Sequence, residues 1–257
     1  VTEQINRKVM VDGRWIFDFA SCNYLGIDLQ PEVMEAIPPA LKKWGVHPSW
    51  TRAVASPGFY EDLERALADL VGAPMTLVFP AVTLLHAGVL PVLAGSNGVI
   101  FKDISAHHSI IEACRLAQTI GTEYLDFRHN DPADLEEKLA RYPYEQTKII
   151  AIDGVYSMSG EYPPLPEFAR LAKKYNAWVY MDDAHGIGVI GENPSPEMPY
   201  GHKGNGIVRY YGLDYVEDRL IYVAGLSKSF SSFGAFITCN DMKMKNLFRS
   251  ASTFIFS

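Results

Sequence analysis

The sequence predicts an α/β protein, a three-layer sandwich in which a mostly parallel sheet is covered by helices on both faces. Short apolar runs alternate with helix-like segments along most of the 257 residues. The runs are continuously apolar, as in strands that are buried on both faces of a sheet. No internal repeat or low-complexity tract interrupts this alternation. Strands that alternate with helices are typical of parallel sheets.

The expected strands, in chain order, are residues 76–79, 98–101, 122–127, 148–155, 178–183, 220–225 and 235–240. The helices expected between them cover 83–93, a stretch from about 109, 131–142 and 164–175. Asp131 is a good N-cap for the third helix, and the fourth has prolines early and a lysine pair late. An N-terminal arm and one helix from near Pro31 precede them. Residues 191–219 are expected to form a long loop, either a lid or interface segment or a surface insertion.

The composition and net charge of the chain argue against some classes of function. The chain is 48% hydrophobic and 21% charged, which is ordinary for a soluble globular protein. A net charge of −7 disfavours a nucleic-acid partner, because no basic face is available for phosphates. Cys22, Cys114 and Cys239 lie far apart without metal or redox spacing, so we expect reduced, buried thiols.

The longest apolar run, residues 75–95, could suggest a membrane span. Pro80, His86 and Pro91 interrupt it and favour a strand, a turn and a buried helix. The polar first ten residues contain no apolar signal core. We therefore expect a soluble, cytoplasmic protein.

The segment VYMDDAHGIGVIG, residues 179–191, places two aspartates and a histidine at the end of a strand. Gly186, Gly188 and Gly191 also fit G-x-G-x-x-G, the fingerprint of a dinucleotide site. That fingerprint needs a helix after its glycines, and the three prolines of the following ENPSPEMP are incompatible with one. The dinucleotide hypothesis is therefore disfavoured.

A metal site is also disfavoured. No paired ligand spacing such as H-x-x-x-H occurs, and the candidate ligands come from separate strand ends. Those candidates are His107, His108, His129, Asp182, Asp183 and His185.

A lysine offers a third hypothesis. In AGLSKSF, Lys228 lies just past a strand, between Ser227 and Ser229. The carboxyl ends of parallel strands are where such sheets carry their chemistry. A semi-buried lysine at that edge suits Schiff-base formation with a carbonyl compound, although a lone lysine in a polar loop is more often simply a surface group.

Pyridoxal phosphate accounts for the other strand ends. A buried aspartate, here Asp182, keeps the pyridine nitrogen of this cofactor protonated, and His185 can reach the ring hydroxyl. The cofactor phosphate favours backbone N–H groups at a helix N-terminus, and the turn FPAVTLL supplies one near Thr83.

These motifs resemble the α-oxoamine synthases, pyridoxal-phosphate enzymes of fold type I. The family includes 8-amino-7-oxononanoate synthase, glycine C-acetyltransferase, 5-aminolevulinate synthase and serine palmitoyltransferase. The resemblance covers nearly the whole chain. Its motifs, in the family's order, are NYLG (23–26), DISAHHS (103–109), HND (129–131), DGVYSMSGEYPPLPE (153–167), DDAHGIGVIG (182–191) and LSKSF (226–230).

The resemblance implies roles for individual residues. Lys228 matches the Schiff-base lysine, Asp182 the partner of the pyridinium, His185 the ligand of the ring oxygen and His107 the histidine that stacks on the ring. These four are the expected catalytic residues. Asn23 matches an asparagine that contacts the substrate carboxylate. The expected cofactor-binding residues are Val82, Thr83, His107, Ser157, Asp182, His185, Ser227 and Lys228. Asp183 is expected to be structural.

Two departures fall on the phosphate end of the site. The phosphate turn commonly reads Ser-Gly-aromatic in the family, whereas here it is AVT, residues 81–83. The family often has Thr three residues before the lysine, where this chain has Gly225. These changes suggest a divergent branch.

The resemblance implies the large domain of the type I pyridoxal-phosphate transferase fold. We expect an arm and helix over 1–45, the large domain over 46–240 and, over 241–257, the start of a connection to a small C-terminal domain absent from this chain. The implied reaction condenses an α-amino acid with an acyl thioester, with decarboxylation to an α-amino ketone, in a homodimer. An aminotransferase or lyase of the same fold and a non-catalytic subunit remain alternatives.

Overall fold

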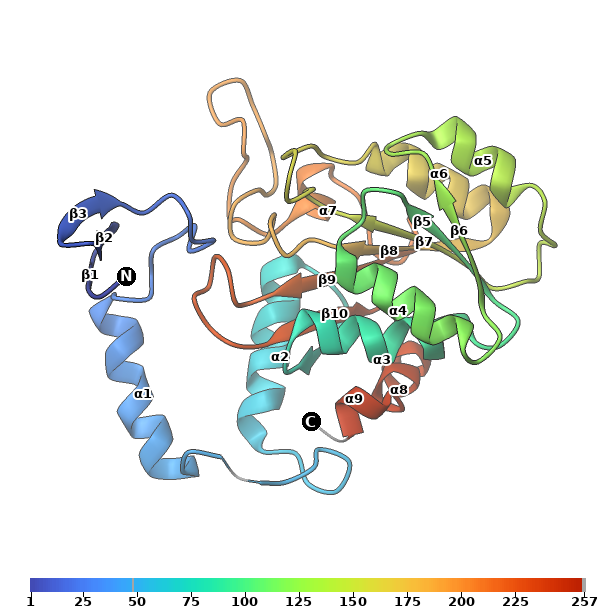
Figure 1. The fold of residues 1–257 in the computed structure, drawn as a ribbon. Coiled ribbons are helices and arrows are strands. Elements are labelled where there is room, and N and C mark those ends of the chain that lie inside the picture. Colours follow the sequence, from blue (N-terminus) through green and yellow to red (C-terminus); the bar gives the residue numbers. More distant parts are fainter. Residues whose placement is uncertain (48, 256–257) are drawn as a thin grey trace.

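The computed structural model describes residues 1–47 and 49–255, which contain a seven-stranded sheet (Figure 1). The strands lie in the order β4-β10-β9-β8-β7-β5-β6. Neighbours from β9 to β6 pair in parallel, whereas β10 runs antiparallel to both β4 and β9. The strands are β4 Met75–Phe79, β5 Val99–Asp103, β6 Glu123–Phe127, β7 Lys148–Asp153, β8 Ala177–Asp182, β9 Leu220–Gly225 and β10 Ala235–Cys239. The expected mostly parallel sheet is confirmed.

Helices cover both faces of the sheet, as Figure 1 shows. One face packs against α3 Val82–Ala94, α4 His108–Gln118, α8 Met242–Arg249 and α9 Ser252–Ile255. The other face packs against α2 Gly58–Val71, α5 Pro132–Leu139, α6 Leu165–Tyr175 and α7 Ile207–Tyr210. Successive residues of a strand point to opposite faces, so Ile149 joins one core and Ile150 the other. Each such side chain contributes roughly 1.5–3 kcal/mol of burial free energy. The three-layer sandwich is therefore confirmed.

Most predicted elements lie within a few residues of the observed ones. Asp131 caps α5 as expected, because its carboxylate accepts the N–H groups of Ala133 and Asp134. The strand expected over 148–155 ends at Asp153, where the chain leaves the sheet toward the cavity described below. Helix α2 was not expected from the sequence. Within the part of the chain that the structure describes, no helix is both long and apolar enough to cross a bilayer.

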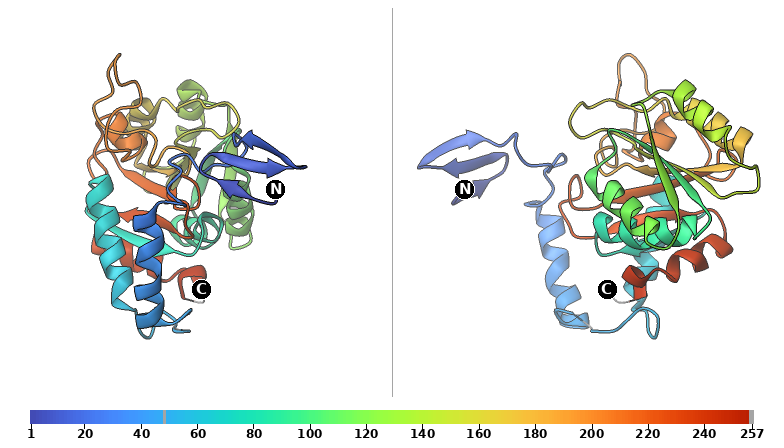
Figure 2. Two further views of the ribbon diagram at one scale, coloured as in Figure 1. Left: turned by 90° about the vertical axis from the view of Figure 1, so that its left-hand side faces the viewer. Right: turned by 45° about the vertical axis from the view of Figure 1, so that its right-hand side comes forward.

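The N-terminal arm projects from the body of the protein (Figure 2). It holds an antiparallel meander of β1 Gln4–Ile5, β2 Lys8–Val11 and β3 Arg14–Phe17, followed by α1 Pro31–Trp44. The helix near Pro31 was expected, but the meander was not. Its second turn is Asp12–Gly13, with φ of +49° and +75°, and Asp-Gly is a common hairpin turn. Residues 256–257, at the end of the expected connecting segment, lie outside the described residues.

Candidate active site

The carboxyl ends of β5, β7, β8 and β9 meet the N-termini of α3 and α4 around a cavity of about 220 Å³. This is the edge at which parallel sheets carry their binding sites. The cavity is lined by Ala81, Val82, Thr83, His107, Ser109, Asp153, Val155, Asp182, Ala184, His185, Ser227 and Lys228. Seven of the expected site residues, Val82, Thr83, His107, Asp182, His185, Ser227 and Lys228, are thus brought together.

Lys228 enters the cavity from the turn between β9 and β10. Ser231 N–H bonds to the Lys228 carbonyl, and Leu226 N–H bonds to the carbonyl of Gly234, which together hold this turn closed. Among residues 1–47 and 49–255, the Lys228 ammonium has no hydrogen-bond or ion-pair partner. The side chain is partly buried. Its amine is therefore available to a ligand in the cavity.

Two aspartates lie side by side at one wall of the cavity. Asp153 and Asp182 are register partners at the ends of β7 and β8, and both are buried. Burial and the charge of Asp182 raise the pKa of Asp153 to about 8. Burial also disfavours ionised Asp182, but hydrogen bonds from His86 and Ala184 and the charge of Lys228 hold its pKa below the ordinary value. The cavity wall therefore carries one ionised and one neutral acid at neutral pH.

His86 was missed as a site residue. It lies in the buried middle of α3, and its Nε2 is 2.9 Å from Asp182 Oδ2. A histidine inside the apolar run 75–95 was the signal that could have identified it. Asp153 was also missed as a site residue, although it is the first residue of the motif DGVYSMSGEYPPLPE.

His185 also lines the cavity and contacts the N-terminal arm. The Tyr24 hydroxyl is 2.7 Å from His185 Nδ1. Burial raises the pKa of Tyr24 to about 12, and burial together with the charge of Lys228 lowers that of His185 to about 4. Both groups are thus neutral, and the contact allows Tyr24 to donate to Nδ1 while Nε2 carries the proton. Sequence reasoning missed this contact between Tyr24 and His185.

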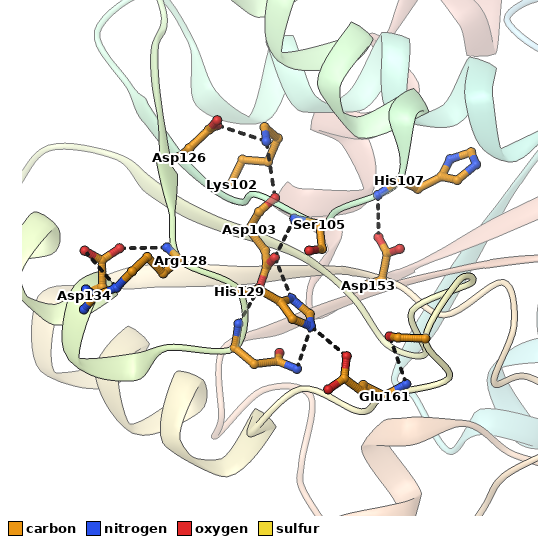
Figure 3. A network of polar contacts seen from close by, with 12 residues as sticks. Lys102, Asp103, Ser105, His107, Asp126, Arg128, His129, Asp134, Asp153 and Glu161 are labelled. Carbon is orange, nitrogen blue, oxygen red and sulfur yellow. Dashed lines mark hydrogen bonds and ion pairs between the residues drawn. The ribbon is translucent and has the colours of Figure 1, made fainter.

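His107 is the N-cap residue of α4. Its Nδ1 accepts the N–H of Ser109 and lies 2.7 Å from Ser109 Oγ, while its own backbone N–H donates to Asp153 Oδ1 at 3.0 Å (Figure 3). Burial lowers the pKa of the ring, which favours the neutral form. These bonds fix the imidazole at the rim of the cavity, where its face can cover a planar ligand.

The first turn of α3 closes the end of the cavity nearest β4. Its N-cap residue, Ala81, offers no side-chain hydrogen bond, so the N–H groups of Val82 and Thr83 lack a side-chain cap. Backbone N–H groups and the helix dipole at such a terminus favour an anion. The Cβ of a residue at position 225 would be 2.8 Å from Val82 Cγ2. Val82 therefore fills the space that a side chain at Gly225 would take.

Two expected site residues lie outside the cavity lining. Asn23 is tied to the turn after Lys228, because its Oδ1 accepts Ser231 Oγ at 2.7 Å, and its amide nitrogen donates to Asp28. Ser157 is exposed in the loop after β7, from which Val155 lines the cavity instead. The roles expected of these two residues stay predictions.

Asp183 points away from the cavity and supports the loop over 191–219. Its Oδ2 accepts the N–H of Ile207 and the hydroxyl of Tyr222, both at 2.9 Å. The glycines of the G-x-G-x-x-G pattern pack nearby. Gly188 has a φ of +80°, and a Cβ at Gly191 would lie 2.0 Å from the carbonyl oxygen of His202. Tight packing against this loop explains these glycines, and no helix follows Gly191 within the loop's first residues.

A second polar network braces the loop that carries Val155 and Ser157 (Figure 3). His129 Nδ1 is 2.9 Å from Asp103 Oδ1 at the end of β5, and its Nε2 is 3.2 Å from Glu161. Burial opposes the charged imidazole, but the bonds and charges of Asp103 and Glu161 outweigh it and raise the pKa of His129. This network joins the loop after β7 to the sheet edge.

The family model for aminotransferase class I and II matches residues 16–257. The chain therefore belongs to that family. Its named relatives within the family are α-oxoamine synthases, so the resemblance seen in the motifs is confirmed. The chain is 35% identical over 251 residues to 8-amino-7-oxononanoate synthase from Chromobacterium violaceum, and these residues are 97% of this chain and 61% of the relative. It is 33% identical to serine palmitoyltransferase from Sphingobacterium spiritivorum, covering 97% of this chain and 59% of the relative.

Solved structures give the same fold. Serine palmitoyltransferase from S. paucimobilis, solved with a PLP–myriocin aldimine, superposes with a TM-score of 0.88 at 30% identity and covers 100% of this chain and 64% of that one. The enzyme from Sphingomonas wittichii gives a TM-score of 0.87, also at 30% identity, over 98% of this chain and 60% of that one. The expected type I transferase fold is confirmed. The chain spans about three fifths of the length of the curated relatives it matches.

The contact between Val82 and Gly225 predicts a coupled pair. Gly225→Thr should lower the free energy of unfolding by roughly 1–3 kcal/mol, because its Cβ would overlap Val82 Cγ2. Val82→Ala removes that methyl group, so the double variant should lose less stability than the sum of the single losses. Urea unfolding of the four proteins measures this coupling. Additive losses would show that the two positions do not compete for space.

The His129 network predicts a pH-dependent contribution to stability. A raised pKa means that the bound proton stabilises the fold below the ordinary value of 6.5. This contribution is lost as the pH rises through the pKa of the folded state. The stability difference between wild type and His129→Gln should therefore be largest at pH 5.5 and shrink toward pH 9. His108→Gln, at an exposed position, is the control. A difference that stays constant over this range would contradict the assignment.

Proposed function

We propose that this chain carries the pyridoxal-phosphate site of an α-oxoamine synthase, an acyltransferase that condenses an α-amino acid with an acyl thioester and releases CO2 and the free thiol. One observation carries the proposal: Lys228, which has no polar partner within the described part of the chain, and an ionised aspartate, Asp182, line one cavity with the first turn of α3, whose N-cap residue offers no side-chain hydrogen bond. The named relatives of the chain support the same reaction class.

The residues of the cavity fit the cofactor by their chemistry. Asp182 is the buried anion that a protonated pyridine nitrogen needs. The N–H groups of Val82 and Thr83 would hold the phosphate at the helix N-terminus. The Nε2–H of His185 would donate to the ring oxygen, and the fixed imidazole of His107 would cover one face of the ring. Pyridoxal phosphate, when bound, supplies an electron sink for negative charge at the amino-acid α-carbon.

Lys228 would do two things in this site. Its amine would hold the cofactor aldehyde covalently. As a free amine at the cavity wall, with no polar partner among the described residues, it would also move the proton at the substrate α-carbon. His107 and the buried wall formed by Asp153 and Asp182 would limit access of water to that carbon.

We also propose that the active protein is a cytoplasmic homodimer, in which the arm over 1–45 packs against a second copy while 46–240 forms the large domain. Helix α1 has no buried residue, although its apolar side chains Met34, Ile37 and Leu41 follow helical spacing. A face of this kind favours a partner, because burying its exposed apolar area stabilises association.

The cofactor proposal predicts a visible absorption band. Wild-type protein mixed with pyridoxal phosphate should show the band of a Schiff base, and Lys228→Ala should lose it. Lys203→Ala, which removes an exposed lysine, should keep the band. Wild type should then release free thiol from an acyl thioester when an amino acid is added. A band together with keto-acid-dependent turnover and no thiol release would instead indicate an aminotransferase. Absence of the band in wild type would contradict the proposal.

The dimer proposal predicts a change of mass in solution. Sedimentation equilibrium should give twice the chain mass for wild type, and Ile37→Asp should shift the protein toward the monomer. Glu35→Ala, on the same helix, is the matched control and should leave the mass unchanged. A dimer that survives Ile37→Asp would place the interface elsewhere.

A further inference from the structure

His86 makes two hydrogen bonds where the surroundings offer little else that is polar. Its side chain is 0% exposed in α3, among Leu85, Val89 and Leu90. Its Nε2 lies 2.9 Å from Asp182 Oδ2, and its Nδ1 lies 2.8 Å from the hydroxyl of Tyr180. Both partners are on β8, two residues apart, and therefore on the same face of the strand. The ring therefore bridges two residues of the strand that supplies Asp182.

The two partners determine which nitrogen of His86 carries the proton. Burial raises the pKa of Tyr180 well above its ordinary value, so the phenol keeps its proton. Within residues 1–47 and 49–255 that hydroxyl contacts only His86, so it donates to Nδ1. Ionised Asp182 can only accept, so Nε2 is the donor to Oδ2. A neutral imidazole with its proton on Nε2 satisfies all three groups.

The same bond distinguishes Asp182 from its neighbour Asp153. Besides His86, the titratable groups that interact with Asp182 are His107, Asp153, Tyr180, Asp183, His185, Tyr222 and Lys228. Both oxygens of Asp182 accept an N–H, from His86 and from Ala184, whereas Asp153 accepts one, from His107. A buried carboxylate retains its charge where its lone pairs are satisfied. The hydrogen bond from His86 is therefore the additional bond that Asp182 accepts and Asp153 lacks.

We propose that His86 is a positioning residue that keeps Asp182 ionised and turned toward the cavity, with Tyr180 holding the imidazole in the required tautomer. The proposal deepens the proposed function, because Asp182 is the group expected to face the pyridine nitrogen. His86 acts through Asp182 and does not line the cavity.

The first test uses the protein without cofactor. Carbon-13 NMR of labelled aspartate follows the titration of Asp182, assigned with Asp182→Asn. In wild type and in His86→Gln, whose amide can reach the Nε2 position, Asp182 should stay ionised to low pH. In His86→Leu its titration should shift upward. Val89→Ala controls for loosened packing in α3. An unchanged titration in folded His86→Leu would overturn the proposal.

Two measurements cover the case in which His86→Leu fails to fold. His86→Asn keeps a polar group near Tyr180 but is too short to reach Asp182, so it should show the same upward shift. Nitrogen-15 NMR of the wild-type imidazole should show the proton on Nε2. A proton on Nδ1 would overturn the assignment of the bridge.

The second test adds pyridoxal phosphate and measures its dissociation constant. His86→Leu should bind about tenfold more weakly or worse, since a bond to a charged group is lost, whereas His86→Gln and Val89→Ala should stay near wild type. Equal affinity in His86→Leu would overturn the proposal. If wild type binds no cofactor, the proposed function fails, while the titration of Asp182 still decides the role of His86.

Discussion

Two carboxyl groups set side by side in the sheet constrain everything around them. Asp153 and Asp182 end neighbouring strands in register, and the low dielectric of their surroundings makes two adjacent negative charges costly. The neighbours therefore determine which acid keeps its charge. Asp182 receives two N–H groups, whereas Asp153 receives one, and the charge of Lys228 acts on both. The cavity thus holds both a carboxylate and an amine. A carboxylate can pair with a protonated aromatic nitrogen, and an amine can react with an aldehyde.

The parallel pairing of the sheet makes this arrangement possible. Each strand from β9 to β6 ends at the same edge, so residues far apart in the chain converge there without long loops. The antiparallel insertion of β10 between β4 and β9 returns the chain after Lys228 to the opposite edge and keeps α3 beside the cavity. The arm completes the site from outside, because Tyr24 contacts His185 and Asn23 contacts Ser231. The arm therefore contacts both a residue of the cavity lining and the turn that carries Lys228.

The end of the cavity that we propose for the phosphate differs from the common family pattern in a compensated way. Val82 stands where the family commonly has glycine, and Gly225 stands where it often has threonine. The Val82 side chain fills the space that a side chain at position 225 would take. The backbone N–H groups of α3 remain in place, since this exchange alters side-chain volume and not the helix. The chain keeps the electrostatics of an anion site while changing its shape. Such a change affects which ligands fit more than whether an anion is favoured.

Local patterns in the sequence determined the strands and most helices to within a few residues, because apolar runs, caps and prolines act on their immediate neighbours. The motifs around Lys228 and Asp182 also identified the cofactor class, since the residue types and their order carry the chemistry. The Asp12–Gly13 turn could have predicted the hairpin of the arm as well. Tertiary structure alone decided the antiparallel place of β10, the bond of His86 to Asp182 and the contact of Tyr24 with His185. Each depends on which distant segment a side chain meets, and that is set by packing of the whole sheet and its helices.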